Sequence, residues 1–496
     1  MAERAYLAID MGASSGRHLI GRFDGQKLRL QEVYRFENGP VEMAGRLYWD
    51  LPGLWSRVRQ GLSAARTAEG GAAIVSVGVD TWGVDFGLLG RGDELLGNPY
   101  HYRDARTNGM LDRAFAIVPR QEIFRHTGLQ FMQLNSLYQL LAMKLGNSPL
   151  LDVAESLLFM PDLMHWLLTG VKCNEMTEAS TSQFYDPVKC SWAVELLDKL
   201  GLPTHILGKI IQPGTTLGPL RGAVAAETGL QAKVVLPGSH DTASAVMAVP
   251  AQSQPGRRPD WCYISLGTWA LMGIESPCPV INDQVLNLNF TNEGGVGNTI
   301  RLLKNITGLW LVQECRRVWS QGAQPWHWED LNRLAAAARP LVSFINPDAA
   351  DFMAPESMPR AIAEFCGRTG QAVPQDEGAV LRCALDSMAM KFRQVLGYCE
   401  ELNGEAIKTI HIVGGGTQNR LLCQAAADAC GRRVVAGPIE ATAIGNIMLQ
   451  ALADGAVGTI AEAREVVRRS FEVEEYEPRN TAAWDEAYER FLQVVG

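Results

Sequence analysis

The first ninety residues of the chain alternate short apolar runs with a single amphipathic segment. The apolar runs are rich in β-branched residues and are bounded by glycine or polar residues, which predicts strands over 6–10, 17–23, 28–36, 74–80 and 84–89. Between the third and fourth runs, Leu54, Val58, Leu62 and Ala65 recur at helical spacing, which predicts a helix over 51–68. This pattern is typical of a mixed α/β domain.

The same opening recurs in the second half of the chain. Residues 262–267 and 269–275 read as strand, short Gly/Thr turn and strand, and a third strand is predicted over 285–290. Helices are predicted over 308–320, 418–430, 441–454 and 481–495, with a buried strand over 409–413. The second half is therefore predicted to be a diverged copy of the first.

The stretch between the two halves, VPAQSQPGRRPD, has the Pro, Gln, Ser and Gly content of a linker. A chain of 496 residues also exceeds the usual size of one domain. We predict a first domain over 1–248, a linker over 249–260 and a second domain over 261–496.

Composition narrows the classes of function. A formal net charge of −9 disfavours a nucleic-acid partner, because such proteins concentrate basic residues to neutralise phosphates. The apolar run at 264–274 is far below the roughly 20 residues that span a bilayer, and the first ten residues lack the core of a signal peptide. We expect a cytoplasmic protein, a monomer or small homo-oligomer, that binds a small molecule and neither nucleic acid nor membrane.

The ten cysteines form no CxxC pair, so a structural metal site is not expected. Most should be small buried hydrophobes in a reducing cytosol, although Cys366 with Cys383, or Cys423 with Cys430, can pair under oxidation.

Three glycine-containing turns could hold phosphates. In AIDMGASSGR, Asp10 ends a predicted strand and a Gly/Ser turn follows; backbone N–H groups there suit an anion and the carboxylate suits Mg²⁺ held through water, although a plain hairpin turn fits equally well. Thr268 lies in the corresponding turn of the second half. Gly415 lies in HIVGGGTQN, where a strand meets a helix and a flat ligand or a phosphate can approach the backbone.

Asp241, in GSHDTASA, is the most informative single residue. An acidic residue at a predicted helix start can simply cap the helix, and it can equally be a general base for a hydroxyl group. His240 is interpreted as a sugar-binding or structural residue.

Two segments near strand ends, VDTWGVDF and YRDART, are dense in hydrogen-bonding and aromatic groups. Carboxylates, arginines and an aromatic wall are typical of sugar sites, and a structural ion-pair network is equally compatible with each residue taken singly. The candidates are Asp80, Trp82, Tyr102, Arg103, Asp104 and Arg106.

Taken together and in order, the segments IVSVGVDTWGVDF, YRDARTNG, LNSLYQL, MPDLMHWLLTG, SHDTASAV, SLGTWALMG, TNEGG, LKNITGLWLVQ, HIVGGG and GPIEATAIGN resemble the FGGY family of carbohydrate kinases over nearly the whole chain. The resemblance implies an α/β, two-lobed, actin-like ATPase fold built from duplicated ribonuclease-H-like domains, with ATP and sugar meeting in an interlobe cleft. It also implies ATP-dependent phosphorylation of a ketose, L-rhamnulose, at O1, with Mg²⁺ accompanying ATP.

The resemblance also assigns roles to particular residues. It implies that Asp241 is the catalytic base and that Asp10 is the metal-binding residue. The implied sugar-binding residues are Gly83, His240, Asp241, Thr242 and Asn305. The implied nucleotide-binding residues are Ala13, Ser14, Ser15, Gly16, Arg17, Thr268, Gln313 and Gly415.

Three alternatives remain open from the sequence. The phosphate-binding segments are equally compatible with a kinase for L-fuculose or another ketose. A sugar-responsive binding protein that lost catalysis would keep the fold, but Asp10, Asp241 and the paired turns argue against it. An actin- or chaperone-like ATPase is disfavoured by the sugar-type segments.

Overall fold

The computed structural model describes residues 3–68, 73–252, 258–322 and 325–495, which form two compact units. The first unit comprises Met1–Gln252, Glu275–Leu302 and Ala441–Phe471, and the second comprises Ser253–Ile274, Leu303–Glu440 and Glu472–Gly496. The first stretch of the first unit therefore ends within the predicted linker. Residues 253–257 of that linker lie outside the described residues, and the predicted domain limits stay a prediction.

The first unit is mixed α/β. Its strands are β1 (Arg4–Met11), β2 (Ser15–Phe23), β3 (Leu28–Glu37), β4 (Val41–Met43), β5 (Arg46–Tyr48), β6 (Ile74–Thr81), β7 (Phe86–Leu89), β8 (Ser156–Phe159), β9 (Asn174–Glu175), β10 (Tyr185–Asp186), β11 (Ser191–Trp192), β12 (Ile210–Ile211), β13 (Thr216–Pro219), β14 (Lys233–Val235) and β17 (Thr291–Gly294). Its helices are α1 (Leu51–Thr67), α2 (Met110–Ile117), α3 (Arg120–Thr127), α4 (Ser136–Leu145), α5 (Leu150–Val153), α6 (Met160–Thr169), α7 (Met176–Ala179), α8 (Val194–Lys199), α9 (Gly222–Thr228), α10 (Asp241–Met247), α11 (Asp283–Leu288), α17 (Ala441–Ala453) and α18 (Ile460–Ser470), with 3₁₀ turns at Arg91–Asp93 and Ala105–Thr107.

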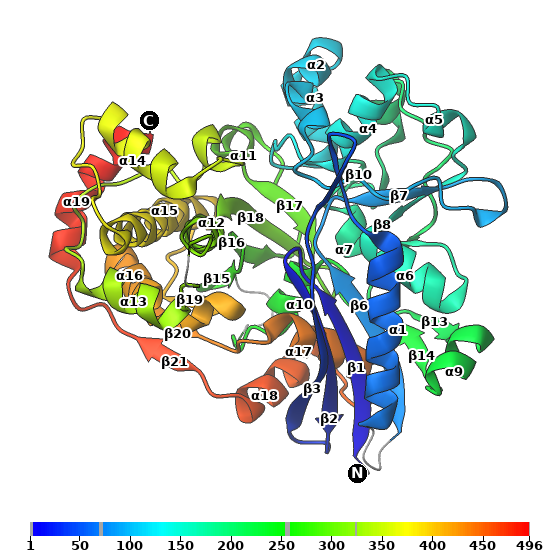
Figure 1. Cartoon of the computed structure of the whole chain (residues 1–496). Coiled ribbons are helices and arrows are strands. Elements are labelled where there is room, and N and C mark those ends of the chain that lie inside the picture. The colour runs from blue at the N-terminus through cyan, green and yellow to red at the C-terminus, as the bar shows by residue number, and fades with distance from the viewer. Residues whose placement is uncertain (1–2, 69–72, 253–257, 323–324, 496) are drawn as a thin grey trace. The chain divides into compact units, whose positions relative to one another are not determined.

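The main sheet of the first unit has the strand order β13-β14-β6-β1-β2-β3. Strand β1 is buried from Ala5 to Met11, as expected for a central strand covered on both faces. Helix α1 packs on β2 and β3, while α17 packs on β1 and β6 (Figure 1). A second apolar core, built around α4, β7, β8 and α8, completes the unit.

The second unit repeats this design. Its strands are β15 (Trp261–Leu266), β16 (Trp269–Ser276), β18 (Ile300–Thr307), β19 (Thr409–Val413), β20 (Arg433–Ala436) and β21 (Glu474–Tyr476), where β16 ends and β18 begins in residues of the first unit. Its helices are α12 (Trp310–Trp319), α13 (Trp328–Ala337), α14 (Met358–Arg368), α15 (Glu377–Asn403), α16 (Arg420–Cys430) and α19 (Thr481–Val495), with 3₁₀ turns at Ala350–Phe352 and Gly415–Gln418.

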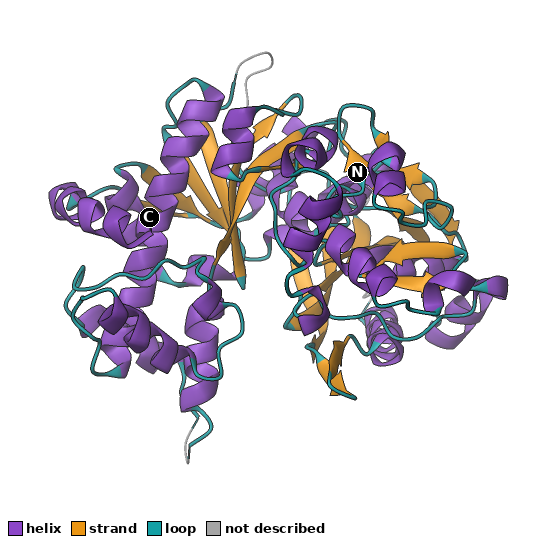
Figure 2. Cartoon of the chain, turned by 90° about the horizontal axis from the view of Figure 1, so that it is seen from above, coloured by secondary structure: helices purple, strands orange, loops and turns teal. Residues whose placement is uncertain are grey.

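The order β18-β16-β15-β19-β20-β21 matches β3-β2-β1-β6-β14-β13 strand for strand. The pairs β1–β2 and β15–β16 are both antiparallel, β1–β6 and β15–β19 are both parallel, and the edge pairs β13–β14 and β20–β21 are both antiparallel. Helices flank the strands of each sheet (Figure 2). The predicted α/β class and the predicted duplication are confirmed.

Two local predictions are wrong. The strand predicted over 285–290 is the helix α11, because Asn282 caps its start by accepting a hydrogen bond from the Val285 N–H, and Asn289 ends it in the left-handed region at φ 53°. The strand predicted over 84–89 begins only at Phe86, since Val84 has φ 70°. The helix predicted over 481–495 is confirmed as α19, with Trp484 and Phe491 buried.

All ten cysteines are free thiols, and Cys366 lies 3.9 Å from Cys383, Sγ to Sγ. Within the described ranges, the helices are all too short or too polar to cross a membrane.

Candidate active site

Three carboxyl groups of the first unit gather at one end of its sheet. Asp10 and Asp80 lie near the ends of β1 and β6 and are register partners in that parallel pair. The residue after Asp80, Thr81, forms a β-bridge with His240, and its N–H donates to the Ser239 carbonyl at 2.9 Å. Asp241, the first residue of α10, therefore follows at the same end, where α/β sheets usually bind their ligands.

Asp241 is the most accessible of the three, with 32% of its side chain exposed. Its Oδ1 accepts a hydrogen bond from the Thr242 hydroxyl at 3.0 Å. Burial, and the negative charge of Asp10, raise the pKa of Asp241 to about 7. A carboxylate with a pKa near neutral is well matched to accepting a proton from a hydroxyl group. The N-cap residue of α10 is His240, so Asp241 lies in the first turn of the helix and is not its cap.

Asp80 is fully buried, and its Oδ2 accepts a hydrogen bond from the Asn446 side chain at 2.6 Å. Burial, with the nearby charge of Asp10, raises the pKa of Asp80 well above its ordinary value. A chain of side-chain hydrogen bonds from Asn446 through Gln450 to Ser76 fixes this arrangement between α17 and β6. Asp80 is thus held inside the unit, and the structure offers no surface on it for the predicted sugar contact.

The predicted first nucleotide turn lies between β1 and β2. Ser14 is exposed, Ala13 and Ser15 are partly exposed, and the turn is closed by a hydrogen bond from the Gly12 N–H to the Ser15 carbonyl at 2.9 Å. A Cβ at Gly16 would lie 2.2 Å from the Phe36 ring, so a larger residue there would displace that ring. The turn therefore presents an exposed, tightly closed backbone.

Arg17 follows this turn and pairs with Asp10. Its Nε and Nη2 donate to Asp10 Oδ2 at 3.1 and 3.0 Å, and the two residues are cross-strand partners. The ion pair joins the predicted nucleotide-binding arginine to the predicted metal-binding carboxylate. Either group would exchange its partner when a phosphate or a cation binds.

The donors at this end of the sheet fit a magnesium ion bound together with phosphates. The described residues contain no preformed group of three His, Cys, Asp or Glu side chains able to hold a metal. Mg²⁺ usually keeps several waters and takes only one or two carboxylates alongside the phosphates of its nucleotide. Asp10 supplies one such carboxylate.

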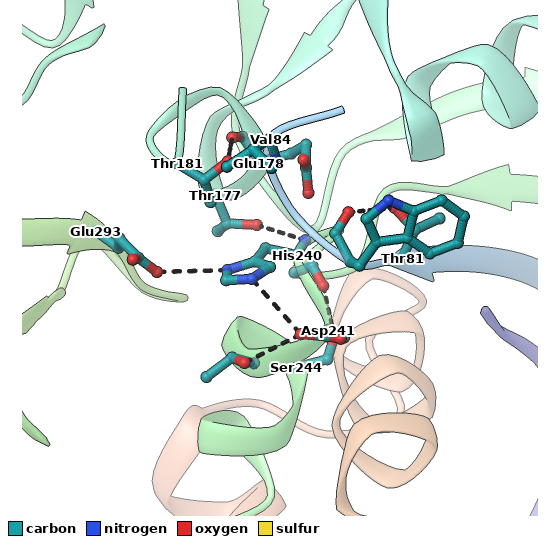
Figure 3. A network of polar contacts seen from close by, with 12 residues as sticks. Thr81, Val84, Thr177, Glu178, Thr181, His240, Asp241, Ser244 and Glu293 are labelled. Atoms are coloured by element: carbon teal, nitrogen blue, oxygen red, sulfur yellow. Dashed lines mark hydrogen bonds and ion pairs between the residues drawn. The ribbon is translucent and has the colours of Figure 1, made fainter. Parts of the chain in front are cut away.

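Gly83 lies against His240 in the first unit. A Cβ at Gly83 would stand 3.1 Å from Thr181 Oγ1 and 3.3 Å from His240 Nε2, closer than most side chains tolerate. The next residue, Val84, adopts φ 70°, which is rare for a β-branched residue. Its N–H donates to Thr181 Oγ1 at 3.1 Å, and both residues lie close to His240 in Figure 3. Its carbonyl accepts a hydrogen bond from the Ser136 hydroxyl at 2.5 Å. The strained peptide is thus fixed beside the histidine.

The other predicted sugar contacts form a buried network around Asp85. Its carboxylate accepts hydrogen bonds from the indole N–H groups of Trp49 at 2.6 Å and Trp82 at 3.0 Å and from the Tyr102 backbone. Asp104 is 2% exposed and accepts from the backbone of Leu47. A structural network of buried polar groups therefore describes these residues better than direct contact with a sugar.

Arg106 belongs to the same network. Its guanidinium covers the Tyr100 ring at 3.9 Å and donates to Gln139 at 2.7 Å, and burial lowers the pKa of Arg106 to about 10. Arg103 lies over the Tyr102 ring at 5.3 Å.

The predicted nucleotide residues of the second unit lie on adjacent turns. The Thr268 hydroxyl, between β15 and β16, donates to Gln313 Oε1 of α12 at 3.3 Å, and the Thr268 carbonyl accepts from the Trp310 N–H at 3.1 Å. A Cβ at Gly308 would meet the Trp269 carbonyl carbon at 2.6 Å. The β15–β16 turn is therefore locked to the start of α12.

Gly415 opens the 3₁₀ turn that follows β19. A Cβ at Gly416 would lie 2.2 Å from the Leu266 side chain, whereas nothing lies within 4 Å of a Cβ at Gly415. The Gly415 face is open to a flat ligand. Asn305, on β18 of this unit, is partly buried. Neither placement tests the role predicted for Gly415 or for Asn305, so both roles stay predictions.

Sequence reasoning missed the residues that hold His240 and Asp80 in place. Arg301 and Glu293 contact His240, and Asn446 binds Asp80. A signal was present for Arg301, because a charged residue inside an apolar run needs a partner when that run is buried. The segments TNEGG and GPIEATAIGN were recognised as typical of the family, but nothing in either segment indicates which side chain it contacts.

Comparison with solved structures defines the class of the fold. The chain is similar to the gluconate kinase from Lactobacillus acidophilus, with a TM-score of 0.78 at 16% identity over 99% of this chain and 98% of that one. A likeness at this identity shows the fold alone, which is the two-domain, actin-like fold of sugar kinases.

Comparison of sequences then identifies the family. Residues 5–248 match the N-terminal domain and residues 262–453 the C-terminal domain of the FGGY family of carbohydrate kinases. The rhamnulokinase of Bacteroides thetaiotaomicron is 43% identical over 99% of both chains, and that of Pectobacterium atrosepticum is 42% identical over 99% of this chain and 96% of its own. The chain belongs to the FGGY family of carbohydrate kinases.

Proposed function

We propose that this carbohydrate kinase transfers the γ-phosphoryl group of ATP to O1 of L-rhamnulose, giving L-rhamnulose 1-phosphate and ADP. Relatives called rhamnulokinases, 37–43% identical over 95% or more of this chain, support the choice of sugar. Because the reaction consumes ATP, the proposed location is the cytoplasm.

The observation that carries the proposal is the environment of Asp241. Its Oδ1 accepts from Thr242, which leaves Oδ2 to take the proton of the sugar hydroxyl. A pKa of about 7 leaves a large fraction of Asp241 deprotonated at neutral pH while keeping it basic enough to accept that proton. The sugar O1 then bonds to the γ-phosphorus as the bond from that phosphorus to the β–γ bridging oxygen breaks, and ADP leaves.

The other residues bind and orient. Phosphoryl transfer depends mainly on positioning and charge stabilisation, so the two Gly-containing turns are proposed to hold the phosphates through backbone N–H groups. Arg17 supports this role because it supplies a cation beside the first turn. When bound with ATP, Mg²⁺ would neutralise charge on the phosphates, and Asp10 is the residue proposed to hold it through water.

A coupled ADP-release assay with magnesium tests the proposal. L-Rhamnulose should support turnover well above L-fuculose, and no ADP should form without sugar. A preference for L-fuculose would identify a different ketose kinase, and sugar-independent ADP release would identify an ATPase. Binding of ketose without turnover would identify a sugar-responsive binding protein.

Asp241→Asn tests the assignment of the base. The variant should lose about 10²–10⁴-fold in kcat, the usual value of general-base help, while its Kd for ATP stays near that of the wild type. Asp198→Asn, an exposed change on the C-terminal part of α8, is the matched control and should leave both values unchanged. Full activity of Asp241→Asn would exclude Asp241 as the base.

A further inference from the structure

Arg301 is a charged residue of the first unit that is completely buried. It lies on β18 at 0% exposure, and its Nε donates to the Gly294 carbonyl at 2.9 Å. Its Nη2 lies 3.2 Å from Glu293 Oε2 and 3.0 Å from His240 Nδ1. A buried cation costs stability unless it is paired, and well-packed apolar residues often serve a fold equally well. The position of Arg301 against a histidine of the candidate site therefore needs an explanation.

The contact with Arg301 decides which nitrogen of His240 carries the proton. A guanidinium has only donors, so His240 Nδ1 must be the acceptor in a 3.0 Å contact. Glu293 Oε2 also lies near Nδ1, but at 3.5 Å, and a proton on Nδ1 would face the closer arginine N–H. Burial and the charge of Arg301 lower the pKa of His240 well below its ordinary value, so the ring is neutral. Its one proton then lies on Nε2.

The Nε2 side of the ring faces the proposed base. His240 Nε2 lies 3.5 Å from Asp241 Oδ1, and Figure 3 shows the ring between Glu293 on one side and Asp241 on the other. Oδ1 is the oxygen that already accepts from the Thr242 hydroxyl. The Thr242 hydroxyl and the His240 Nε2–H are therefore both directed at Oδ1, and Oδ2 is left free of these two donors.

We propose that Arg301 is a positioning residue that holds His240 in its Nε2–H tautomer, so that His240 donates towards Asp241 Oδ1 and keeps Oδ2 as the oxygen that takes the sugar proton. The catalytic half of this inference rests on the proposed function. The tautomer half does not, because it concerns the ligand-free protein.

The tautomer is measured directly by nitrogen-15 NMR on protein labelled at histidine. The His240 signals are identified as those lost in His240→Asn. A protonated Nε2 and an unprotonated Nδ1 are expected, without change in shift from pH 6 to pH 8. A proton on Nδ1, or a positively charged ring, would overturn the proposal whatever the activity of the protein.

The functional half is tested by a charge-neutral double variant, since Arg301→Met alone would strand the Glu293 charge. In Arg301→Met/Glu293→Gln the donor to Nδ1 is gone and the new side-chain amide carbonyl at position 293 can accept from Nδ1–H, so the Nδ1–H tautomer should become populated. We expect kcat to fall about 10–100-fold, the range for groups that orient a functional side chain. The KM for ATP should stay unchanged.

Arg382→Met/Asp386→Asn is the matched control. This ion pair of the second unit is similarly buried, with a 2.8 Å contact, and does not involve His240. It should leave the histidine signals and kcat unchanged. A tautomer change in Arg301→Met/Glu293→Gln with wild-type kcat would refute the positioning role. If that double variant fails to fold, Arg301→Lys keeps a charged donor and should preserve both the Nε2–H tautomer and most of kcat; loss of the tautomer there would also count against the proposal.

Discussion

A methyl group at position 445 should disturb the fold and the proposed chemistry together. Gly445 lies in α17, where that helix crosses α10, and a Cβ at this position would stand 1.8 Å from the Ser244 carbonyl oxygen and 2.6 Å from its carbonyl carbon. Both atoms are backbone, so no side-chain rotation relieves the clash. Gly445→Ala must therefore push α10 away from α17.

The size of the effect follows from these distances. An ordinary contact begins at 3.4 Å, so α10 must move by about 1.5 Å in a tightly packed interior. Overpacking of this kind costs about 3 kcal/mol at the upper end of its usual range, and the better helix propensity of alanine returns about 1 kcal/mol. The net loss of about 2 kcal/mol should lower the Tm of the first unit by about 4–8 °C.

The kcat of Gly445→Ala should fall by more than its loss of stability alone would explain. Asp241 begins α10 three residues before Ser244, so it moves with the helix. A displacement of about 1 Å in a reacting group costs roughly 100-fold in rate. Circular dichroism melts would give the Tm, and ADP release with L-rhamnulose at a temperature where the variant is folded would give kcat.

Gly397→Ala is the control for this experiment. Gly397 lies in α15 of the second unit, is exposed, and would have nothing within 4 Å of its Cβ, so the same substitution should stabilise by about 1 kcal/mol without changing kcat. A wild-type Tm for Gly445→Ala would show that the helices do not cross this closely. A lowered Tm with wild-type kcat would show that the placement of α10 does not govern catalysis.

Three further predictions concern single groups. Burial lowers the pKa of His18 to about 3. As pH falls below about 6.5, the unfolded chain binds a proton at His18 while the folded protein does not, so the free energy of unfolding decreases. Between pH 7 and pH 5 the wild type should therefore lose about 2 kcal/mol more stability than His18→Leu, measured by urea unfolding. Because burial raises the pKa of Asp80 well above its ordinary value and so favours the uncharged acid, Asp80→Asn should keep its Tm at pH 7 within about 2 °C, and a larger fall would count against this environment for Asp80. Thr268→Val should raise the KM for ATP about 10-fold by removing one donor to a phosphate, with the KM for sugar unchanged; equal rises in both would place Thr268 elsewhere in the mechanism.

The regular parts of the fold could be predicted because they follow local periodicity. The buried strand that ends at Asp10, its repeat that ends at Leu266 and the helix over Thr481–Val495 all follow apolar patterns that the structure confirms. The segment over 285–290 could not, because its apolar residues fit a strand or a helix equally well and the capping asparagines decided the outcome.

The candidate site also has parts that local sequence predicts and parts that depend on the whole fold. The carboxylate Asp241 and the glycine turns are visible as motifs, whereas a motif cannot show that Asp80 is sealed beneath Asn446, 366 positions away in the chain. The aromatic and charged segments near Asp104 look like a sugar site in sequence because sugar sites and buried ion-pair networks use the same residue types. Only burial separates the two, and burial depends on the whole fold.

The start of α10 is held by three distant stretches of the first unit, and this explains how a partly exposed aspartate can keep one orientation. The Glu175 carboxylate accepts from the Ser239 N–H at 3.2 Å, and the Thr177 hydroxyl accepts from the His240 N–H at 3.2 Å. Arg301 contacts the His240 ring, and α17 packs against α10. Each contact reduces the number of conformations open to Asp241 before the sugar binds. The conformational entropy of the base is therefore lost during folding, and little more of it has to be lost during catalysis.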